Sequence, residues 1–262
     1  MIKQQPLITS KAVRIDRGQR SEFDDQVITE TPIAMLYNGV SHAVMMATPS
    51  DLEDFALGFS LSEGIVDSPE HYRFVEVLQS ELGLSLEMAI PQIQFDLLAQ
   101  RQRHSGVASS CGLCGVESLQ AAIRPAPQVD SGMRISIASI SDSIAALSER
   151  QCLNQQSGGV HAAGFVHADG ILVREDVGRH NALDKVIGAL ANQKMGDGFL
   201  VLSSRASYEL IHKAAMADIA VVVAISAPTS MAISLAESCG MTLICFARGE
   251  QMNVYTHAER LI

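Results

Sequence analysis

The sequence predicts an α/β protein in two unequal parts, a smaller strand-rich N-terminal part and a larger three-layer α/β domain. The chain has 262 residues, of which 47% are hydrophobic and 18% are charged, so it can bury a sizeable core in one large domain or two modest ones. After residue 198, continuous apolar runs alternate with stretches of helical period. This alternation is typical of crossover units in a sheet that is covered on both faces.

The N-terminal part begins with a predicted β-hairpin and a helix. Asn38 and Gly39 stand between two apolar-rich runs, which is the strongest short signal for a hairpin with a type I′ turn. Ser50 is expected to cap the following helix, with Glu53 completing a capping box. Apolar residues then recur with helical period until Gly64, which is expected to end the helix.

The rest of the chain divides at a cysteine-containing segment. Residues 74–97 alternate like strands, so residues 1–107 make up the smaller strand-rich part. Residues 108–128 follow as a loop with the sequence Cys-Gly-Leu-Cys, a short helical pattern and a linker with two prolines. Residues 129–262 then form the α/β domain.

The α/β domain is predicted to start with a helix from about Ser141 and a hairpin over residues 160–175, turning at Asp169 and Gly170. A second helix is expected from about His180. Near-continuous apolar strands follow, separated by helices, at residues 199–204, 219–226 and 241–246. We expect a largely parallel sheet in the middle of three layers.

Composition excludes several classes of protein. The formal net charge is −10 with no basic run or stripe, which argues against a non-specific nucleic-acid binder. The longest apolar run, residues 219–225, is too short to span a bilayer, and residues 1–20 lack the apolar segment of a secretory signal. We therefore expect a cytoplasmic protein with neither a nucleic-acid nor a membrane partner. The chain has five cysteines, and in a reducing compartment they are not expected to form a framework of structural disulfides.

An anion site is predicted at the carboxyl edge of the sheet, where ligands of crossover sheets bind. Arg179, Arg205 and Arg248 all follow predicted strands and should meet at this edge. Arginine forks and helix N-termini suit phosphate groups. The alternative is a set of solvated loops and helix caps, which is the simpler explanation for Thr229 and Ser230.

Two histidines are candidate ligands or bases. His180 lies in the polar run 175–181, where several groups able to bind or move protons converge. It could equally belong to a helix start with Asp176 or Asn181 as polar support. His161 is placed on an apolar strand, where a lone histidine is either a hydrogen-bonded core residue or a ligand.

The Cys-Gly-Leu-Cys segment has three possible explanations. A structural zinc site would be half complete, because Cys152, Cys239 and Cys245 stand in segments that look like packing positions. A thioredoxin-like redox pair would need a strand directly before it. The third possibility is a nucleophilic or sulfur-carrying thiol at Cys111 or Cys114, on a loop that leads into a helix N-terminus.

A sulfur-carrying thiol must ionise. A free thiol of pKa about 8.5 is only a few per cent thiolate at neutral pH. A fall of two pKa units requires about 2.7 kcal/mol, of which a helix N-terminus typically provides about 0.3 to 1 kcal/mol. Gly112 and Gly115 leave the backbone free to turn amides toward the sulfur and allow a partner to approach.

Several ordered motifs resemble the FdhD family of formate dehydrogenase accessory sulfurtransferases. The likeness covers nearly the whole chain from about residue 33. The motifs that carry it are residues 57–59, 63–64, 109–115, 158–161, 174–185, 203–205, 246–249 and 253–257. One mild departure is Glu250, where the family often has aspartate.

The resemblance implies a sulfur carrier with a cytidine-deaminase-like fold. It implies a homodimer that takes sulfur from a cysteine desulfurase as a persulfide on Cys111, with Cys114 assisting. The acceptor would be the molybdenum or tungsten bis(molybdopterin guanine dinucleotide) cofactor of formate dehydrogenase, bound as substrate, with GDP as a partial analogue. The cofactor contacts expected from the resemblance and the sheet edge together are Phe246, Ala247, Arg248, Gly249, Glu250, Gln251, Arg205, His180 and Arg179.

Two other functions remain open at this point. A non-catalytic cofactor chaperone would share the binding edge without any sulfur chemistry. A zinc-dependent deaminase needs a ligand-x-Glu motif followed later by Pro-Cys-x-x-Cys. Here Ala163 occupies the Glu position after His161, Ser110 replaces the proline, and the cysteine pair comes before the histidine.

Overall fold

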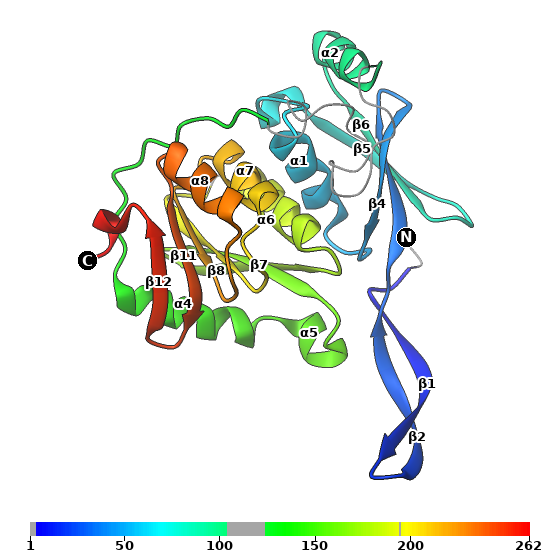
Figure 1. Cartoon of the computed structure of the whole chain (residues 1–262). Helices are drawn as coiled ribbons and strands as arrows, with labels where there is room; N and C mark the ends of the chain where they lie inside the picture. Colours follow the sequence, from blue (N-terminus) through cyan, green and yellow to red (C-terminus); the bar gives the residue numbers. More distant parts are fainter. Residues whose placement is uncertain (1–3, 104–123, 194) are drawn as a thin grey trace.

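The computed structural model describes residues 4–103, 124–193 and 195–262 (Figure 1). Within these residues the strands form sheets of two, four and six strands. Cys111, Cys114 and the helical pattern that follows them lie outside the described residues, so the structure leaves the predictions for this segment untested.

A long N-terminal hairpin projects from the body of the molecule (Figure 1). Its strands are β1 (Leu7–Asp16) and β2 (Gln19–Ile28), which pair antiparallel along their whole length. The turn holds Arg17 and Gly18 at φ angles of 49° and 82°, the left-handed pair that a type I′ turn requires. This region falls in the predicted strand-rich part, but the hairpin itself was not predicted from the sequence.

The four-stranded sheet has the order β4-β3-β6-β5. The hairpin predicted at Asn38 and Gly39 is confirmed, and it joins β3 (Thr31–Tyr37) to β4 (Val40–Ala47). The sheet is completed by β5 (Arg73–Gln79) and β6 (Leu84–Ala89).

The expectation of strands over residues 74–97 is wrong at its C-terminal end. There the chain forms helix α2 (Gln92–Arg103). Pro91 stands immediately before the helix, and its carbonyl accepts a hydrogen bond of 3.1 Å from the Phe95 amide. Proline is tolerated at a helix start, and the Gln, Leu, Ala and Arg residues that follow favour helix.

Helix α1 (Leu52–Ser62) lies where the sequence predicts it, but its start is different. Its N-cap residue is Asp51, in the left-handed conformation and without a side-chain cap. The Ser50 hydroxyl instead accepts a hydrogen bond of 3.3 Å from Nζ of Lys185. The predicted capping box is therefore wrong, because a buried lysine from another helix takes the hydroxyl.

The six-stranded sheet has the order β12-β11-β10-β9-β7-β8. Its strands are β7 (His161–His167), β8 (Gly170–Asp176), β9 (Gly198–Leu202), β10 (Val221–Ala224), β11 (Thr242–Arg248) and β12 (Gln251–Thr256). The hairpin expected over residues 160–175 is confirmed.

In this sheet only the pairs β9–β10 and β10–β11 are parallel, and the pairs β7–β8, β7–β9 and β11–β12 are antiparallel. The expectation of a largely parallel sheet is therefore wrong. Tight turns join β7 to β8 and β11 to β12, and such turns can connect only antiparallel strands. Strand β12 was not predicted from the sequence; it lies at the sheet edge, and its residues alternate between exposed and partly buried positions up to the buried Thr256.

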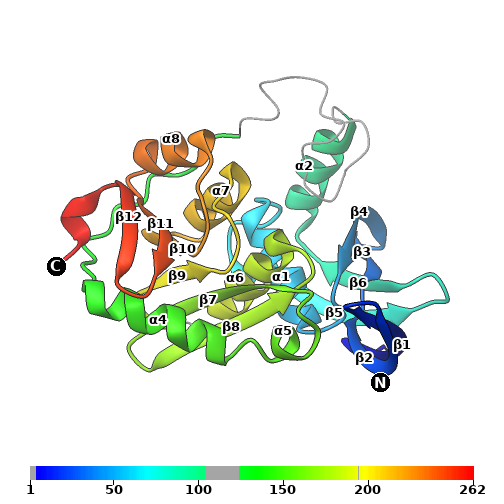
Figure 2. The ribbon, with the colours of Figure 1, turned by 60° about the horizontal axis from the view of Figure 1, so that its bottom comes forward.

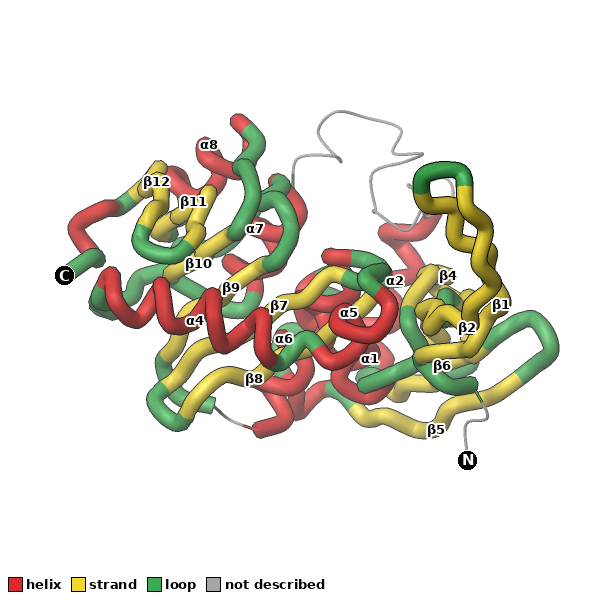
Figure 3. The backbone as a smooth tube through the Cα atoms, turned by 90° about the horizontal axis from the view of Figure 1, so that it is seen from below, coloured by secondary structure: helices red, strands yellow, loops and turns green. Residues whose placement is uncertain are grey.

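Helices cover both faces of this sheet and give the three layers predicted for the domain (Figures 2 and 3). On one face lie α6 (Arg179–Gln193), α7 (Tyr208–Met216) and α8 (Ser230–Ser238). The other face carries α4 (Ile137–Glu149), which crosses the strands in Figure 3 and leads to the short helix α5 (Cys152–Ser157). Helix α4 starts earlier than predicted, because Ser136 caps it.

Two short 3-10 segments, η1 (Pro69–His71) and η2 (Ala258–Arg260), complete the described elements. None of the helices in the described ranges combines the length and the apolar character that a bilayer crossing requires.

Helices α1 and α6 cross in direct backbone contact, and this crossing joins the two parts of the molecule. A Cβ atom at Gly58 would lie 1.7 Å from the Asp184 carbonyl oxygen, and one at Gly188 would lie 1.9 Å from the Asp54 carbonyl oxygen. Glycine is therefore required at both positions. Leu61 packs against both apolar cores, one under each large sheet.

Candidate functional site

The carboxyl ends of the parallel strands form one continuous edge. Strands β9, β10 and β11 end there, and β8 and α6 meet at the same edge because His161 at the start of β7 pairs with Asp176 at the end of β8. Hydrogen bonds tie this corner to the loop after β9. The Ala162 amide donates to Oγ of Ser203 at 2.8 Å, and the Ser203 amide donates to the Ala162 carbonyl at 3.0 Å.

The loops after the three parallel strands are also bound to one another. The Ala206 amide donates to the Ala227 carbonyl at 3.1 Å, and the Thr229 amide donates to the Ala206 carbonyl at 3.0 Å. Thr229 caps α8 through its hydroxyl, which accepts from the Ala232 amide at 3.2 Å. The simpler explanation of Thr229 as a helix cap is thus confirmed, and the edge is a fixed surface.

Arg179, Arg205 and Arg248 lie along this edge as a row. Arg205 and Arg248 are exposed, and Arg179 is partly buried. Arg205 follows β9 and Arg248 ends β11, two strands further on, which corresponds to about 10 Å at the usual spacing between strands. Arg179 follows β8, two strands from β9 in the other direction. One phosphate could not contact all three arginines, but an extended anionic ligand could.

Phe246 is held in an unusual conformation at this edge. It lies in a bulge, where the β11–β12 register shifts between Cys245 and Arg248, and its φ angle is 53°. Its side chain is 39% exposed although Cys245 and Ala247 beside it are buried. Its amide donates to the Ser226 carbonyl at 3.1 Å. Bulges and left-handed non-glycine residues concentrate at functional sites, where they redirect a side chain.

The turn after Phe246 is exposed and anchored from beneath. Gly249 has a φ angle of 55°, and its carbonyl accepts a hydrogen bond of 2.8 Å from Oγ of Ser141 on α4. Arg248, Glu250 and Gln251 are all exposed beside it. The predicted contact run 246–251 is therefore an accessible hairpin turn, except for the buried Ala247.

His180 lies in the first turn of α6 with its side chain only 15% exposed. Its Nε2 atom has no hydrogen-bond partner among the described residues, and the nearest carboxylate oxygen, Oε2 of Glu209, is 4.0 Å away. Burial lowers the pKa of His180 to about 4, and the charges of Arg179 and Lys213 add to this effect. The imidazole is therefore neutral at pH 7.

His161 shares this environment. Its pKa is also lowered, by burial and by the nearby Arg179. Among the described residues, Nε of Arg179 and Oγ of Ser207 are further buried atoms without a hydrogen-bond partner. Buried polar groups in proteins are nearly always paired, so these atoms are available to hydrogen-bond with a polar ligand at the edge.

A second polar cluster, which was not predicted from the sequence, lies beside the edge. Nζ of Lys213 lies 2.9 Å from Oδ1 of Asp184 and 2.8 Å from Oε1 of Glu63. Ser62 donates to the same Asp184 oxygen at 2.6 Å. Arg124 pairs with the other oxygen of Glu63. These residues connect α1, α6, α7 and the start of the second described range.

Charge pairing outweighs burial for Glu63 and Lys213, whereas for Asp184 burial is the larger effect and raises the pKa of that carboxyl group. Burial opposes ionisation of Glu63, but Lys213 and Arg124 hold its pKa well below the usual range. Burial likewise disfavours the Lys213 ammonium, yet Asp184 and Glu63 raise its pKa above the usual value. The signal that could have revealed the cluster was a lysine on an otherwise apolar helix face, next to buried Ile211 and Ala214.

Three cysteines fall within the described residues. Cys239 and Cys245 are buried, and burial raises the pKa of Cys245 to about 12. Cys152 is exposed at the start of α5. In the described part of the chain, no group of three or more His, Cys, Asp or Glu residues is arranged to hold a metal ion.

Comparison with known proteins gives a consistent result. Residues 28–262 match the FdhD/NarQ family. The chain is 53% identical over 256 residues to the sulfur carrier protein FdhD of Xanthomonas campestris (strain B100), covering 96% of this chain and 91% of that protein. It is 43% identical to the protein of the same name from Bordetella petrii, covering 90% and 87%.

A solved structure shares the fold. It is the crystal structure of a candidate formate dehydrogenase accessory protein from Desulfotalea psychrophila, at 27% identity and a TM-score of 0.77. The alignment covers 98% of this chain and all of the other. The arrangement of sheets and helices described above is therefore that of a known structure.

Proposed function

The chain belongs to the FdhD/NarQ family, and from that premise we propose that it is a sulfur carrier in the maturation of a formate dehydrogenase. Its sulfur is taken from a cysteine desulfurase as a persulfide on Cys111, with Cys114 assisting. The acceptor is the molybdenum or tungsten bis(molybdopterin guanine dinucleotide) cofactor, before insertion into the enzyme. The carrier acts as a homodimer.

The distribution of cysteines is the observation that carries this proposal. Cys239 and Cys245 are buried, and a thiol whose pKa is about 12 is almost entirely protonated at pH 7. Sulfur must arrive from one protein and leave to another molecule, so a buried thiol cannot serve. This leaves the pair at Cys111 and Cys114 as the candidate sulfur carriers. Cys152 is exposed and serves as the control cysteine in the test below.

The sulfur steps balance without an external oxidant. The Cys111 thiolate attacks the terminal sulfur of the desulfurase persulfide, which forms a new S–S bond and releases the donor cysteine as a thiolate. Attack of the Cys114 thiolate on Sγ of Cys111 then releases the carried sulfur as hydrosulfide and leaves a Cys111–Cys114 disulfide. A cellular dithiol must reduce this disulfide before the next cycle.

The chain itself allows the thiols to reach the sheet edge. Arg124 is fixed to α7, because its carbonyl accepts a hydrogen bond of 3.0 Å from the Tyr208 hydroxyl. Cys114 precedes Arg124 by ten positions, which limits their separation to about 35 Å. Glu209 in the first turn of α7 lies 4.0 Å from His180, so a segment that ends at Arg124 is long enough to bring the thiols to the proposed binding edge.

The edge suits a guanine nucleotide half of the cofactor. Arg205 and Arg248 provide guanidinium groups for the diphosphate. The exposed ring of Phe246 provides an aromatic face for the base. The unpartnered atoms of Arg179, His180 and Ser207 lie further along the same edge and can hydrogen-bond to the rest of the substrate.

The test is to incubate the protein with a cysteine desulfurase and cysteine, trap thiols by alkylation, and read the peptides by mass spectrometry. We expect one added sulfur within residues 109–115. Cys111→Ala should abolish both this mass increment and activation of formate dehydrogenase. Cys152→Ala, the matched exposed control, should leave both unchanged.

Two outcomes would replace the proposal. Full activation of formate dehydrogenase by Cys111→Ala would mean that the protein is a cofactor chaperone without sulfur chemistry. Stoichiometric zinc bound by the Cys111 and Cys114 pair would mean that the pair is structural.

A further inference from the structure

We propose that a second copy of this chain docks along the β1–β2 hairpin, with the tip of each hairpin seated in a recess at the base of the other. This interface gives a structural basis to the proposed homodimer. It rests on that part of the proposed function and is independent of sulfur transfer.

The hairpin contacts helix α5 through β2, but no further strand extends its sheet in the described part of the chain. In the described part of the chain, β1 and β2 form a sheet of their own, with ten residues in each strand, which corresponds to about 33 Å. Most of their side chains are exposed on both faces. Two-stranded ribbons are at best marginally stable in water, so the hairpin requires a further packing partner.

Apolar side chains mark both faces of the hairpin. Ile8 and Val27 are cross-strand partners near the base, and they are 53% and 38% exposed. Val13 and Ile15 lie nearer the tip on the opposite face, at 57% and 65% exposure. A second chain packed along the ribbon would remove these side chains from water.

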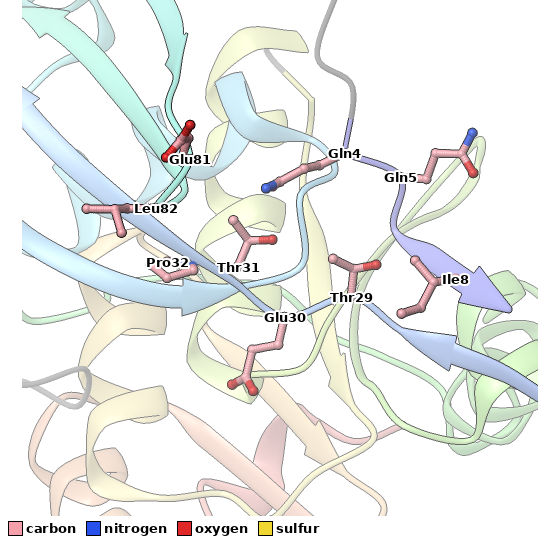
Figure 4. A pocket seen from close by; sticks show the side chains of 9 residues that line it. All are labelled: Gln4, Gln5, Ile8, Thr29, Glu30, Thr31, Pro32, Glu81 and Leu82. Carbon is pink, nitrogen blue, oxygen red and sulfur yellow. The ribbon is translucent and has the colours of Figure 1, made fainter. Parts of the chain in front are cut away.

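The recess at the base of the hairpin is acidic and rich in hydrogen-bond acceptors (Figure 4). It has a volume of about 540 Å³. Its lining consists of Gln4, Gln5, Ile8, Thr29, Glu30, Thr31, Pro32, Glu81 and Leu82. Oε1 of Gln4 and Oγ1 of Thr29 are buried there without a hydrogen-bond partner among the described residues. Leu82 is 87% exposed at its rim.

The tip of the hairpin carries the complementary groups. Arg17 lies in the turn, and Arg14 and Arg20 lie in the adjoining ends of the strands. A guanidinium has five N–H donors and no acceptor. Such a group matches a recess that offers the Glu30 and Glu81 carboxylates together with two unpaired oxygens.

The geometry identifies the occupant as a second copy. The tip and the base lie at opposite ends of the same ribbon, so a hairpin cannot place its own Arg17 beside its own Glu30. Two hairpins that lie side by side and antiparallel bring each tip to the other base. A two-fold axis makes both contacts at once, as expected for a self-complementary dimer interface.

The experiment is light scattering on the full chain over a range of concentrations. We expect a dimer whose dissociation constant rises about tenfold or more when the tip is reversed by Arg17→Glu with Arg20→Glu. Reversal of the recess by Glu30→Arg with Glu81→Arg should weaken the dimer similarly. Mixing the two variants should restore a dimer containing one chain of each, because both contacts are then attractive again.

The control is Arg134→Glu, which reverses an exposed charge away from the hairpin and should leave the dimer unchanged. A wild-type chain that is monomeric at its solubility limit overturns the proposal. So does a dimer that withstands both reversals. If the wild-type protein is monomeric and the tip variant fails to activate formate dehydrogenase, the hairpin instead binds that enzyme. Persulfide formation is measured separately, so failure of either proposal is distinguishable.

Discussion

Two polar regions of this protein lie side by side, and they differ in whether the chain completes them. Around Lys213, the ammonium group contacts the carboxylates of Asp184 and Glu63, and Ser62 adds a further hydrogen bond. Around His180, buried nitrogen and oxygen atoms have no partner among the described residues. Both regions are formed by α6 and α7, so burial alone does not distinguish them.

The paired groups around Lys213 are expected to stabilise the fold, and the unpaired groups around His180 are expected to bind a ligand. A buried ion pair that loses one partner leaves an uncompensated charge in the interior, which costs folding free energy. An unpaired group at an edge already carries its desolvation cost, and a ligand that supplies the missing hydrogen bond recovers it. We therefore expect substitutions around Lys213 to reduce stability and substitutions at the edge to reduce affinity.

The largest expected effect is on folding. Lys213→Met should lower the free energy of unfolding by about 3 to 5 kcal/mol, because it leaves the fully buried Asp184 carboxylate without its cation. Denaturant titration measures this change. Addition of Asp184→Asn to Lys213→Met should recover part of the loss, since the uncompensated charge is then removed. GDP affinity of the folded single variant should remain close to that of wild type.

The contrast would break down if Lys213→Met weakened GDP binding as strongly as folding. That result would mean that the ion cluster forms part of the binding surface, rather than a support for the helices beneath it.

An intermediate effect is expected at the edge. Arg248→Ala should weaken GDP binding by about 1.5 to 3 kcal/mol, or roughly ten- to a hundred-fold, through loss of a charge-assisted hydrogen bond. Because Arg248 is exposed, its free energy of unfolding should change by less than about 0.5 kcal/mol. Calorimetry provides the affinity, with Arg134→Ala as a matched exposed control. Equal affinities in wild type and Arg248→Ala would exclude the β11–β12 turn as the nucleotide site.

The sequence predicted those elements whose signal is local. The Asn38-Gly39 turn and the apolar runs of β9, β10 and β11 were recognised because residues adjacent in sequence determine the turn type and the burial of a strand. Helix α2 was misjudged although its signal is also local, in Pro91 and the helix-favouring residues that follow it. The cap of α1 was misjudged because its signal is not local. The cap depends on Lys185, which lies far from Ser50 in sequence.

The candidate site followed the same rule. The sheet edge could be predicted because each arginine directly follows its own strand. The bulge at Phe246 could not, since it depends on the pairing of β11 with a strand that was not predicted. The partner of Lys213 required knowledge that α1, α6 and α7 meet, and only Gly58 and Gly188 hinted at so close a crossing.

The smallest expected effect is the contribution of His180 to the pH dependence of the free energy of unfolding. Its folded-state pKa of about 4 lies below the ordinary value of 6.5, so the unfolded chain binds more protons between these values. Stability should therefore fall as the pH drops through this window and be unaffected by His180 above it. At pH 5.5 the penalty is about 1 kcal/mol. His180→Asn cannot be protonated and lacks this penalty. When the pH falls from 7.5 to 5.5, the free energy of unfolding of wild type should therefore decrease by about 1 kcal/mol more than that of the variant. Parallel pH profiles for the two proteins would mean that His180 gains a proton as readily in the folded state as in the unfolded chain, and that the edge around it is already satisfied without a ligand.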